Sequence, residues 1–114
     1  MRATHAFVAA GIALTVVLVI AAIDPAAGRL FPGRLRHALA HVLVFALFAF
    51  VWARGLPRVP ALVVAAAAAG FGVLHEGYEI VGHRHGFEFA DALANATGAV
   101  CGVAFARLRR TNAR

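Results

Sequence analysis

The stretch "AFVAAGIALTVVLVIAAI" at residues 6–23 contains no charged side chain and is the first of four apolar runs in the chain. The other three cover residues 35–53, 59–74 and 90–106. All four are near the lower end of the helix lengths, about 17–25 residues, that cross a hydrocarbon core of about 30 Å. Their alanine and leucine content favours helix. The sequence therefore predicts an all-α fold, an integral membrane bundle of four transmembrane helices with short loops, as a single domain over residues 1–114.

The composition also favours lipid as the surrounding medium. Hydrophobic residues make up 62% of the 114 residues and charged residues only 14%, whereas an ordinary soluble domain is about 45–50% apolar. The first run follows Met-Arg and has a cleaved signal peptide as its alternative interpretation. Signal cores are usually about 7–15 residues long, and this run is longer, so we expect it to be a transmembrane helix.

The arginines predict an orientation. With four spans, both termini and the connection between the second and third runs share one side of the membrane. That side carries seven of the eleven arginines, and the chain has no lysine. Because cytoplasmic segments are enriched in basic residues, we predict a multi-pass protein of the bacterial inner (cytoplasmic) membrane with both termini cytoplasmic. The basic tail "RLRRTNAR" (107–114) is expected to bind anionic lipid headgroups, and no nucleic-acid partner is needed to explain it.

The acids and most of the histidines gather on the opposite, outer side. The segment "HEGYEIVGHRHGFEFAD" (75–91) holds four of the five acids and three of the six histidines. If sequential helices are antiparallel neighbours, three polar pairs from three helices reach one depth. Ionisable groups inside a span cost roughly 2.5 kcal/mol or more unless they are paired. An outward-facing polar pocket is therefore predicted from His37 with His41, Glu76 with Glu79, and Asp91 with Asn95.

The fourth run adds a ridge of small residues beside this pocket. Ala94, Gly98 and Gly102 recur every four residues, which places them on one helix face and lets another helix approach closely. We expect this ridge to be a helix-packing surface.

The same polar residues resemble the signature of the VanZ-like family of small membrane proteins. In the family signature, an acid is followed three residues later by a glutamine, then by an arginine-containing loop and the pattern "D...N..G...G". The corresponding residues here are Glu76, Glu79, Asp91, Asn95, Gly98 and Gly102. The upstream "LRHALAHVLVF" (35–45) is similar to the start of a family helix. The family's usual glutamine is Glu79 here, its loop arginine aligns with His85 beside Arg84, and the aspartate before its histidine is His37.

The resemblance implies an accessory protein of the bacterial cell envelope, because the founding members look like accessory determinants of resistance to the glycopeptide teicoplanin. It carries over polar positions but no catalytic residues. We predict that the protein contacts membrane lipid and that its pocket binds a lipid-linked envelope precursor or another amphiphile. We also expect the protein to contribute to glycopeptide tolerance. The expected ligand-binding residues are Arg34, Arg36, His37, His41, Glu76, Glu79, Arg84, His85, Asp91 and Asn95.

Two alternatives from other classes stay open. A small membrane-embedded hydrolase or transferase would use Glu76, Asp91 and His41 as catalytic residues, because a buried carboxylate can act as a general base. A structural helper subunit of a homo-oligomer or larger membrane complex would use the same charges only to fix helix register.

Metal binding is the weakest of the predicted functions. The segment "HEGYE" (75–79) lacks the second histidine of the H-E-x-x-H zinc motif, so we predict no metal and no cofactor. If a metal were bound, His75 and Glu79 would be the first two ligands. The third would come from His83, His85 or His41.

Overall fold

Four long α-helices make up most of the computed structural model, which describes residues 2–83 and 86–112. The helices are α1 (Arg2–Ile23), α2 (Arg34–Gly55), α3 (Ala61–Gly82) and α4 (Phe89–Asn112), with a short 3₁₀ turn, η1 (Ala27–Arg29), after α1. Each helix is long and apolar enough to cross a membrane. The prediction of an all-α bundle of four membrane-length helices is confirmed over this part of the chain.

The helices extend beyond the apolar runs that predicted them, most clearly in α3. The third run ends at Leu74, but α3 continues to Gly82. Hydropathy falls after Leu74 because the next turns carry His75, Glu76 and Glu79. These side chains are buried inside the bundle, so the helix goes on although its sequence turns polar.

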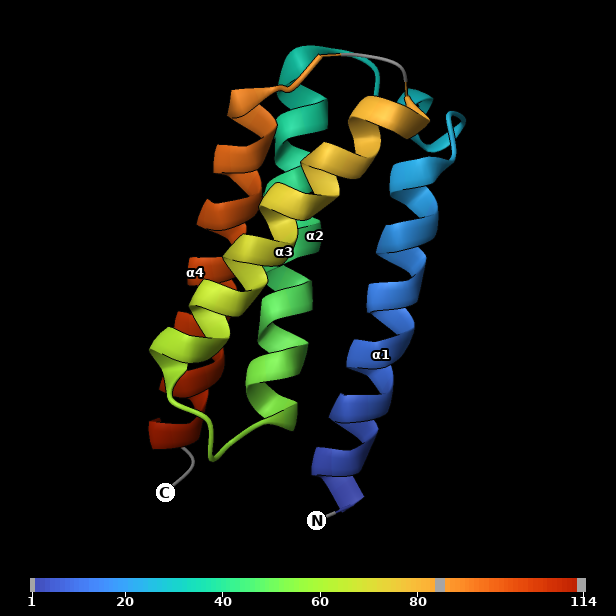
Figure 1. Ribbon diagram of the computed structural model, residues 1–114. Coiled ribbons are helices and arrows are strands. Elements are labelled where there is room, and N and C mark those ends of the chain that lie inside the picture. Colours follow the sequence, from blue (N-terminus) through green and yellow to red (C-terminus); the bar gives the residue numbers. More distant parts are fainter. Residues whose placement is uncertain (1, 84–85, 113–114) are drawn as a thin grey trace.

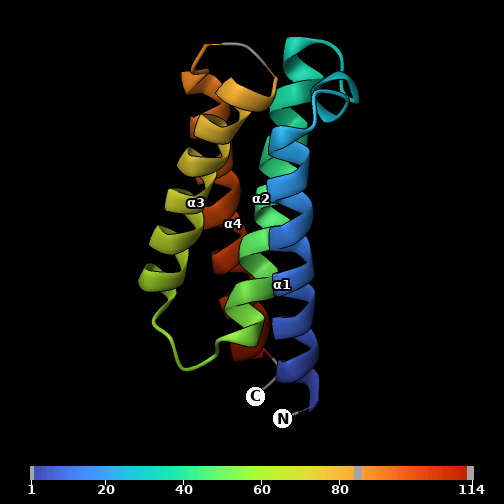
Figure 2. The same ribbon diagram turned by 45° about the vertical axis from the view of Figure 1, so that its right-hand side comes forward.

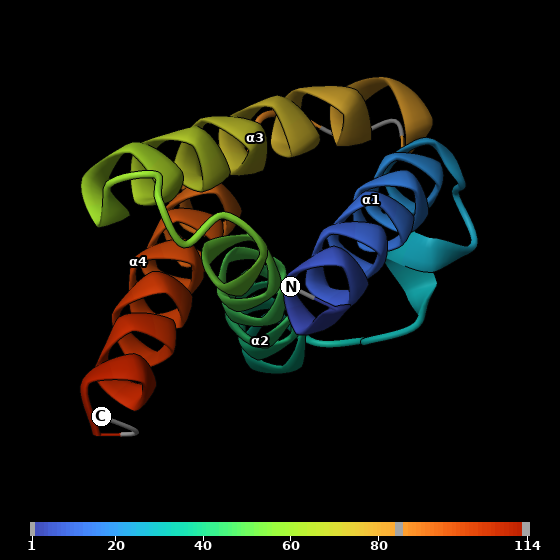
Figure 3. The same cartoon turned by 90° about the horizontal axis from the view of Figure 1, so that it is seen from below.

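The helices pack with α2 at the centre. Figure 3 shows α2 between α1 and α4, with α3 lying across all three. In Figure 2, α1 lies in front of α2, and Trp52 Nε1 of α2 donates a hydrogen bond to Thr15 Oγ1 of α1 at 3.3 Å. Both termini lie at one end of the bundle (Figure 1), which we call the terminal end. The α1–α2 and α3–α4 connections lie at the other, distal end. The polar pairs therefore gather at the distal end.

Small residues bring α4 against the backbone of α2. A Cβ atom added to Gly98 would overlap the carbonyl oxygen of Val42, and one added to Gly102 would overlap that of Ala46. Ala94 is also buried on this face. The absence of side-chain atoms at the two glycines thus sets the distance between α2 and α4.

At the terminal end, Arg107 holds the α2–α3 connection. Its guanidinium donates hydrogen bonds to the carbonyl oxygens of Pro57 at 3.0 Å and Val59 at 2.7 Å. Arg110 donates a further bond to the Pro57 carbonyl at 3.1 Å. Two arginines of the basic tail therefore bind the protein itself, and the binding of the tail to lipid headgroups stays a prediction.

We expect Arg107→Gln to lower the free energy of unfolding by about 1.5–3 kcal/mol, the range for hydrogen bonds to a charged group. The matched control is Arg109→Gln, because Arg109 lies over the exposed ring of Phe105 and not at the connection. Thermal unfolding in detergent should show an early transition for the Arg107 variant only. Equal melting of the two variants would mean that the connection does not depend on these bonds.

Candidate functional site

Polar side chains from α2, α3 and α4 meet inside the bundle near its distal end. Glu76 and Asn95 are fully buried. His37, at the edge of the group, keeps 23% of its side chain exposed. The structure therefore brings together the three polar pairs that the sequence placed at one depth. The other buried members of the group are His41, His75, Glu79 and Asp91.

Asn95 fixes the orientation of His41. The Asn95 amide nitrogen donates a hydrogen bond to the backbone oxygen of Gly72 at 2.9 Å, so its side-chain oxygen is the atom that faces His41. That oxygen lies 2.6 Å from His41 Nδ1. Because an amide oxygen can only accept, Nδ1 must be the donor. In the neutral imidazole, the lone pair of His41 is therefore on Nε2.

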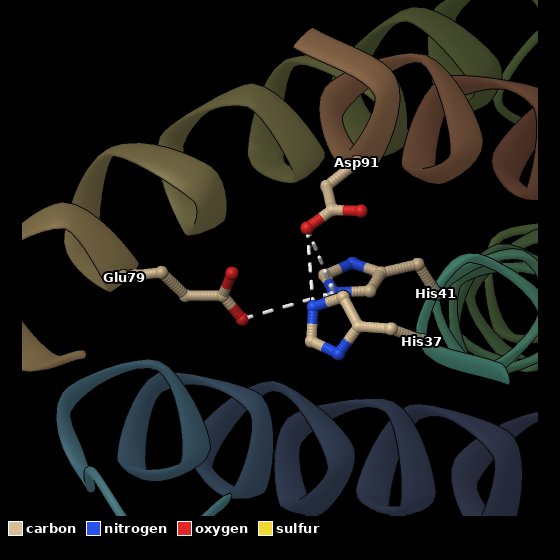
Figure 4. A group of neighbouring side chains, drawn as sticks. All are labelled: His37, His41, Glu79 and Asp91. Carbon is tan, nitrogen blue, oxygen red and sulfur yellow. Dashed lines mark hydrogen bonds and ion pairs between the residues drawn. The ribbon is translucent and has the colours of Figure 1, made fainter. Parts of the chain in front are cut away.

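His41 Nε2 faces three further polar atoms (Figure 4). His37 Nε2 lies 3.1 Å away, Asp91 Oδ2 3.8 Å and Glu79 Oε1 3.9 Å. His37 Nε2 also lies 3.1 Å from Asp91 Oδ2. Figure 4 shows the carboxylates reaching the two rings from α3 and α4, on different sides. These four atoms lie within 4.8 Å of one another, and we call them the His-carboxylate group.

Glu76 contacts the segment just before α4. Its Oε1 atom accepts a hydrogen bond from the backbone nitrogen of Glu88 at 2.8 Å. Glu76, Glu88 and Asp91 also place one oxygen each within 4.8 Å of one another. Glu76 therefore joins α3 to the residues just before α4, whereas Glu79, three residues later, faces the histidines.

His75 and His83 lie near this site without joining the His-carboxylate group. His75 Nδ1 is 3.5 Å from Glu79 Oε1, and its ring meets that of Phe45 edge-on, with centroids 5.3 Å apart. His83 Nε2 lies 2.9 Å from the backbone oxygen of Ala21. Of the expected metal ligands that the structure describes, Glu79 and His41 therefore contribute to the group of four and His75 and His83 do not.

A pocket of about 660 Å³ opens beside the site at the distal end. Part of its wall comes from the α1–α2 connection, with Arg29 and Phe31, and continues to Arg34 at the start of α2. His37 and Asp91 also line it, so the His-carboxylate group is continuous with the pocket. Arg36 is exposed and is not among the lining residues. Arg84 and His85 lie outside the described residues.

Two parts of this site were missed by the sequence reasoning. One is His37 as a possible metal ligand, although the i,i+4 spacing of His37 and His41 on one helix face is a spacing that metal sites use. The other is Arg29, whose only signal was its place on the outer side. The η1 turn, which brings Arg29 to the pocket and lies against the His83 ring, has no recognisable sequence pattern.

Comparisons with protein-family models, with curated proteins and with solved structures give no match to this chain.

Proposed function

We propose that this chain is an accessory membrane protein of the bacterial cell envelope, resembling the VanZ-like family, whose distal pocket binds the headgroup of a lipid-linked precursor or another amphiphile. A link to glycopeptide tolerance is part of this proposal. So is the orientation: the side of the membrane to which the sequence assigns both termini carries seven of the eleven arginines, which favours a cytoplasmic location for that side. The distal pocket would then open at the outer surface of the inner membrane.

The lining of the distal pocket is the observation that supports this proposal most directly. Arg29 and Arg34 are exposed on its wall, and a guanidinium offers phosphate a planar pair of hydrogen-bond donors. Phe31 and Phe89 add apolar surface that is about half or more exposed. A ligand with a phosphate and a hydrocarbon tail would satisfy both kinds of surface.

The acids of the pocket limit which ligands fit. Glu88 and Asp91 line the same pocket as the arginines. Carboxylates repel a bare phosphate, so the ligand should present its anionic part to Arg29 and Arg34. The part that faces the acids should be neutral or accompanied by a cation.

We expect a polyprenyl phosphate to raise the melting temperature of the detergent-solubilised protein, and the matching polyprenol to leave it unchanged. A ligand at about 100 times its dissociation constant adds about 2.7 kcal/mol of stability, which is a shift of several degrees for a chain of this size. Arg34→Gln should remove most of the shift, because it removes one of the two phosphate donors.

Arg36→Gln is the matched control, since Arg36 is two residues away on the same helix, exposed and outside the pocket. Its ligand-induced shift should equal that of the unmodified protein. Equal shifts with polyprenol and polyprenyl phosphate would indicate insertion of the tail alone, and they would argue against headgroup recognition.

A further inference from the structure

We propose that His37, His41, Glu79 and Asp91 bind a divalent transition-metal ion, with zinc as the first candidate, where the distal pocket meets the interior of the bundle. This inference goes beyond the proposed function and does not require the amphiphilic ligand. It also differs from our sequence-based expectation of no metal, because the four residues come from three helices and only folding brings them together.

The distances between the donor atoms suit one ion. In a tetrahedral zinc site the bonds are about 2.0–2.2 Å long, so neighbouring ligand atoms are about 3.3–3.6 Å apart. Four distances within the His-carboxylate group are 3.1, 3.1, 3.8 and 3.9 Å. The other two distances are no longer than 4.8 Å. Side-chain movements of up to about 1 Å would bring all six into the range of a zinc site.

Asn95 prepares His41 for this role. Metal-bound imidazoles usually donate their second ring nitrogen to a carbonyl or carboxylate oxygen, which fixes the tautomer and the direction of the ring. The 2.6 Å contact between His41 Nδ1 and the Asn95 oxygen has this form. It leaves the lone pair on Nε2, the atom directed at His37, Glu79 and Asp91.

The carboxylates provide a second and independent observation. Their side chains are only about one-twentieth exposed, 5% for Glu79 and 6% for Asp91. Asp91 Oδ2 and Glu79 Oε2 are buried and form no hydrogen bond with the described residues. Among these residues, Asp91 Oδ2 has only ion-pair contacts, with His37 at 3.1 Å and His41 at 3.8 Å. Histidines are the only basic side chains that the structure places within 4 Å of these two acids. A divalent cation would offset both negative charges.

The donor types narrow the choice of ion. Two imidazole nitrogens with two carboxylate oxygens suit zinc and the neighbouring first-row metals, whereas magnesium and calcium prefer oxygen ligands alone. The ion has a route to the group, because His37 is partly exposed and lines the pocket together with Asp91.

The test begins with the full chain, purified in detergent and stripped with a chelator. Zinc chloride is then added, and binding is followed by calorimetry and by metal analysis after desalting. We expect about one zinc ion per chain and a rise in the melting temperature. His37→Gln and Asp91→Asn should each weaken zinc binding at least about 10-fold.

His83→Gln is the control, because His83 lines the same pocket and lies outside the His-carboxylate group. It should bind zinc like the unmodified chain. The proposal is overturned if the unmodified chain binds no zinc, or if His37→Gln and Asp91→Asn bind it as tightly as His83→Gln does. The latter result would place the ion on surface histidines.

Cobalt(II) gives an answer that does not depend on the folding of any variant. In the unmodified chain it should develop the intense visible absorption of a four-coordinate ion, and zinc should remove that absorption in competition. A spectrum identical to that of cobalt in buffer alone would rule out the site. Neither result involves a lipid, so failure of the metal site and failure of headgroup binding can be told apart.

Discussion

Replacement of Asn95 by leucine should lower the free energy of unfolding by about 2–6 kcal/mol. Asn95 is fully buried and bonds both the Gly72 carbonyl and His41 Nδ1. Leucine has a similar size but can bond neither group, and each buried polar group left without a partner costs about 1–3 kcal/mol. Thermal unfolding in detergent, combined with the amount of protein that accumulates in membranes, measures the effect.

Thr97→Leu is the matched control for this change. Thr97 lies on the exposed side of α4, and its hydroxyl bonds only the Leu93 carbonyl of its own helix. We expect its melting temperature to stay close to that of the unmodified chain. If Asn95→Leu melted together with Thr97→Leu, the bonds of Asn95 would contribute little to the bundle, and the fixed orientation of His41 would lose its support.

The sequence predicted the helices well because each apolar run is long and because segments with proline or glycine, which disfavour helix, separate the runs. It also placed the three polar pairs at one depth, since helical spacing and short loops fix depth in an antiparallel bundle. The end of α3 was misplaced for a physical reason. Hydropathy measures how lipid-like a residue is, whereas Glu76 and Glu79 are buried against protein.

The contacts within the site could not be predicted to the same extent. Glu76 and Glu79 are three residues apart, so their directions on α3 differ by only about 60°. The rotation and tilt of α3 decide which of them faces the histidines, and these depend on contacts such as that of Gly82 with the backbone of α1. No pattern within one helix contains this information.

The geometry also changes the catalytic alternative. Glu76, Asp91 and His41 were the predicted catalytic residues, but Glu76 Oε1 accepts the hydrogen bond from the Glu88 nitrogen just before α4. Glu79 takes its place near His41, at 3.9 Å. A hydrolase or transferase built on this site would therefore use His41 with Glu79 and Asp91, and Glu76 would support the α3–α4 connection.

The helper-subunit alternative predicts a different effect of substitutions at the same residues. If the charges only fixed helix register, a neutral isostere such as Asp91→Asn should destabilise the chain by several kcal/mol, with or without zinc, because it breaks a buried pair. If they bind an ion, the same substitutions should cancel the stabilisation that the ion provides. The response to added zinc therefore separates a purely structural role from a binding role.

The spacing of α2 and α4 connects the fold to the site, and Gly98→Ala tests this connection. A Cβ at Gly98 would overlap the carbonyl oxygen of Val42, the residue next to His41. Backbone atoms cannot turn aside as a flexible side chain can, so α2 and α4 must move apart. We expect a loss of about 3 kcal/mol, near the upper end for overpacked cores. The increased separation should also weaken zinc binding, because His41 and Asp91 lie on the two separated helices.

Gly70→Ala is the control for the Gly98 variant, because Gly70 lies in α3 with no atom within 4 Å of an added Cβ. Alanine there should stabilise the helix by about 0.5–1 kcal/mol. Melting temperature and zinc affinity are measured on both variants. A Gly98 variant that melts early yet binds zinc normally would show that the His-carboxylate group tolerates movement of α4. Normal melting would instead show that the two helices do not need this close contact. Only a loss of both properties supports the view that the small residues of α4 hold the site together.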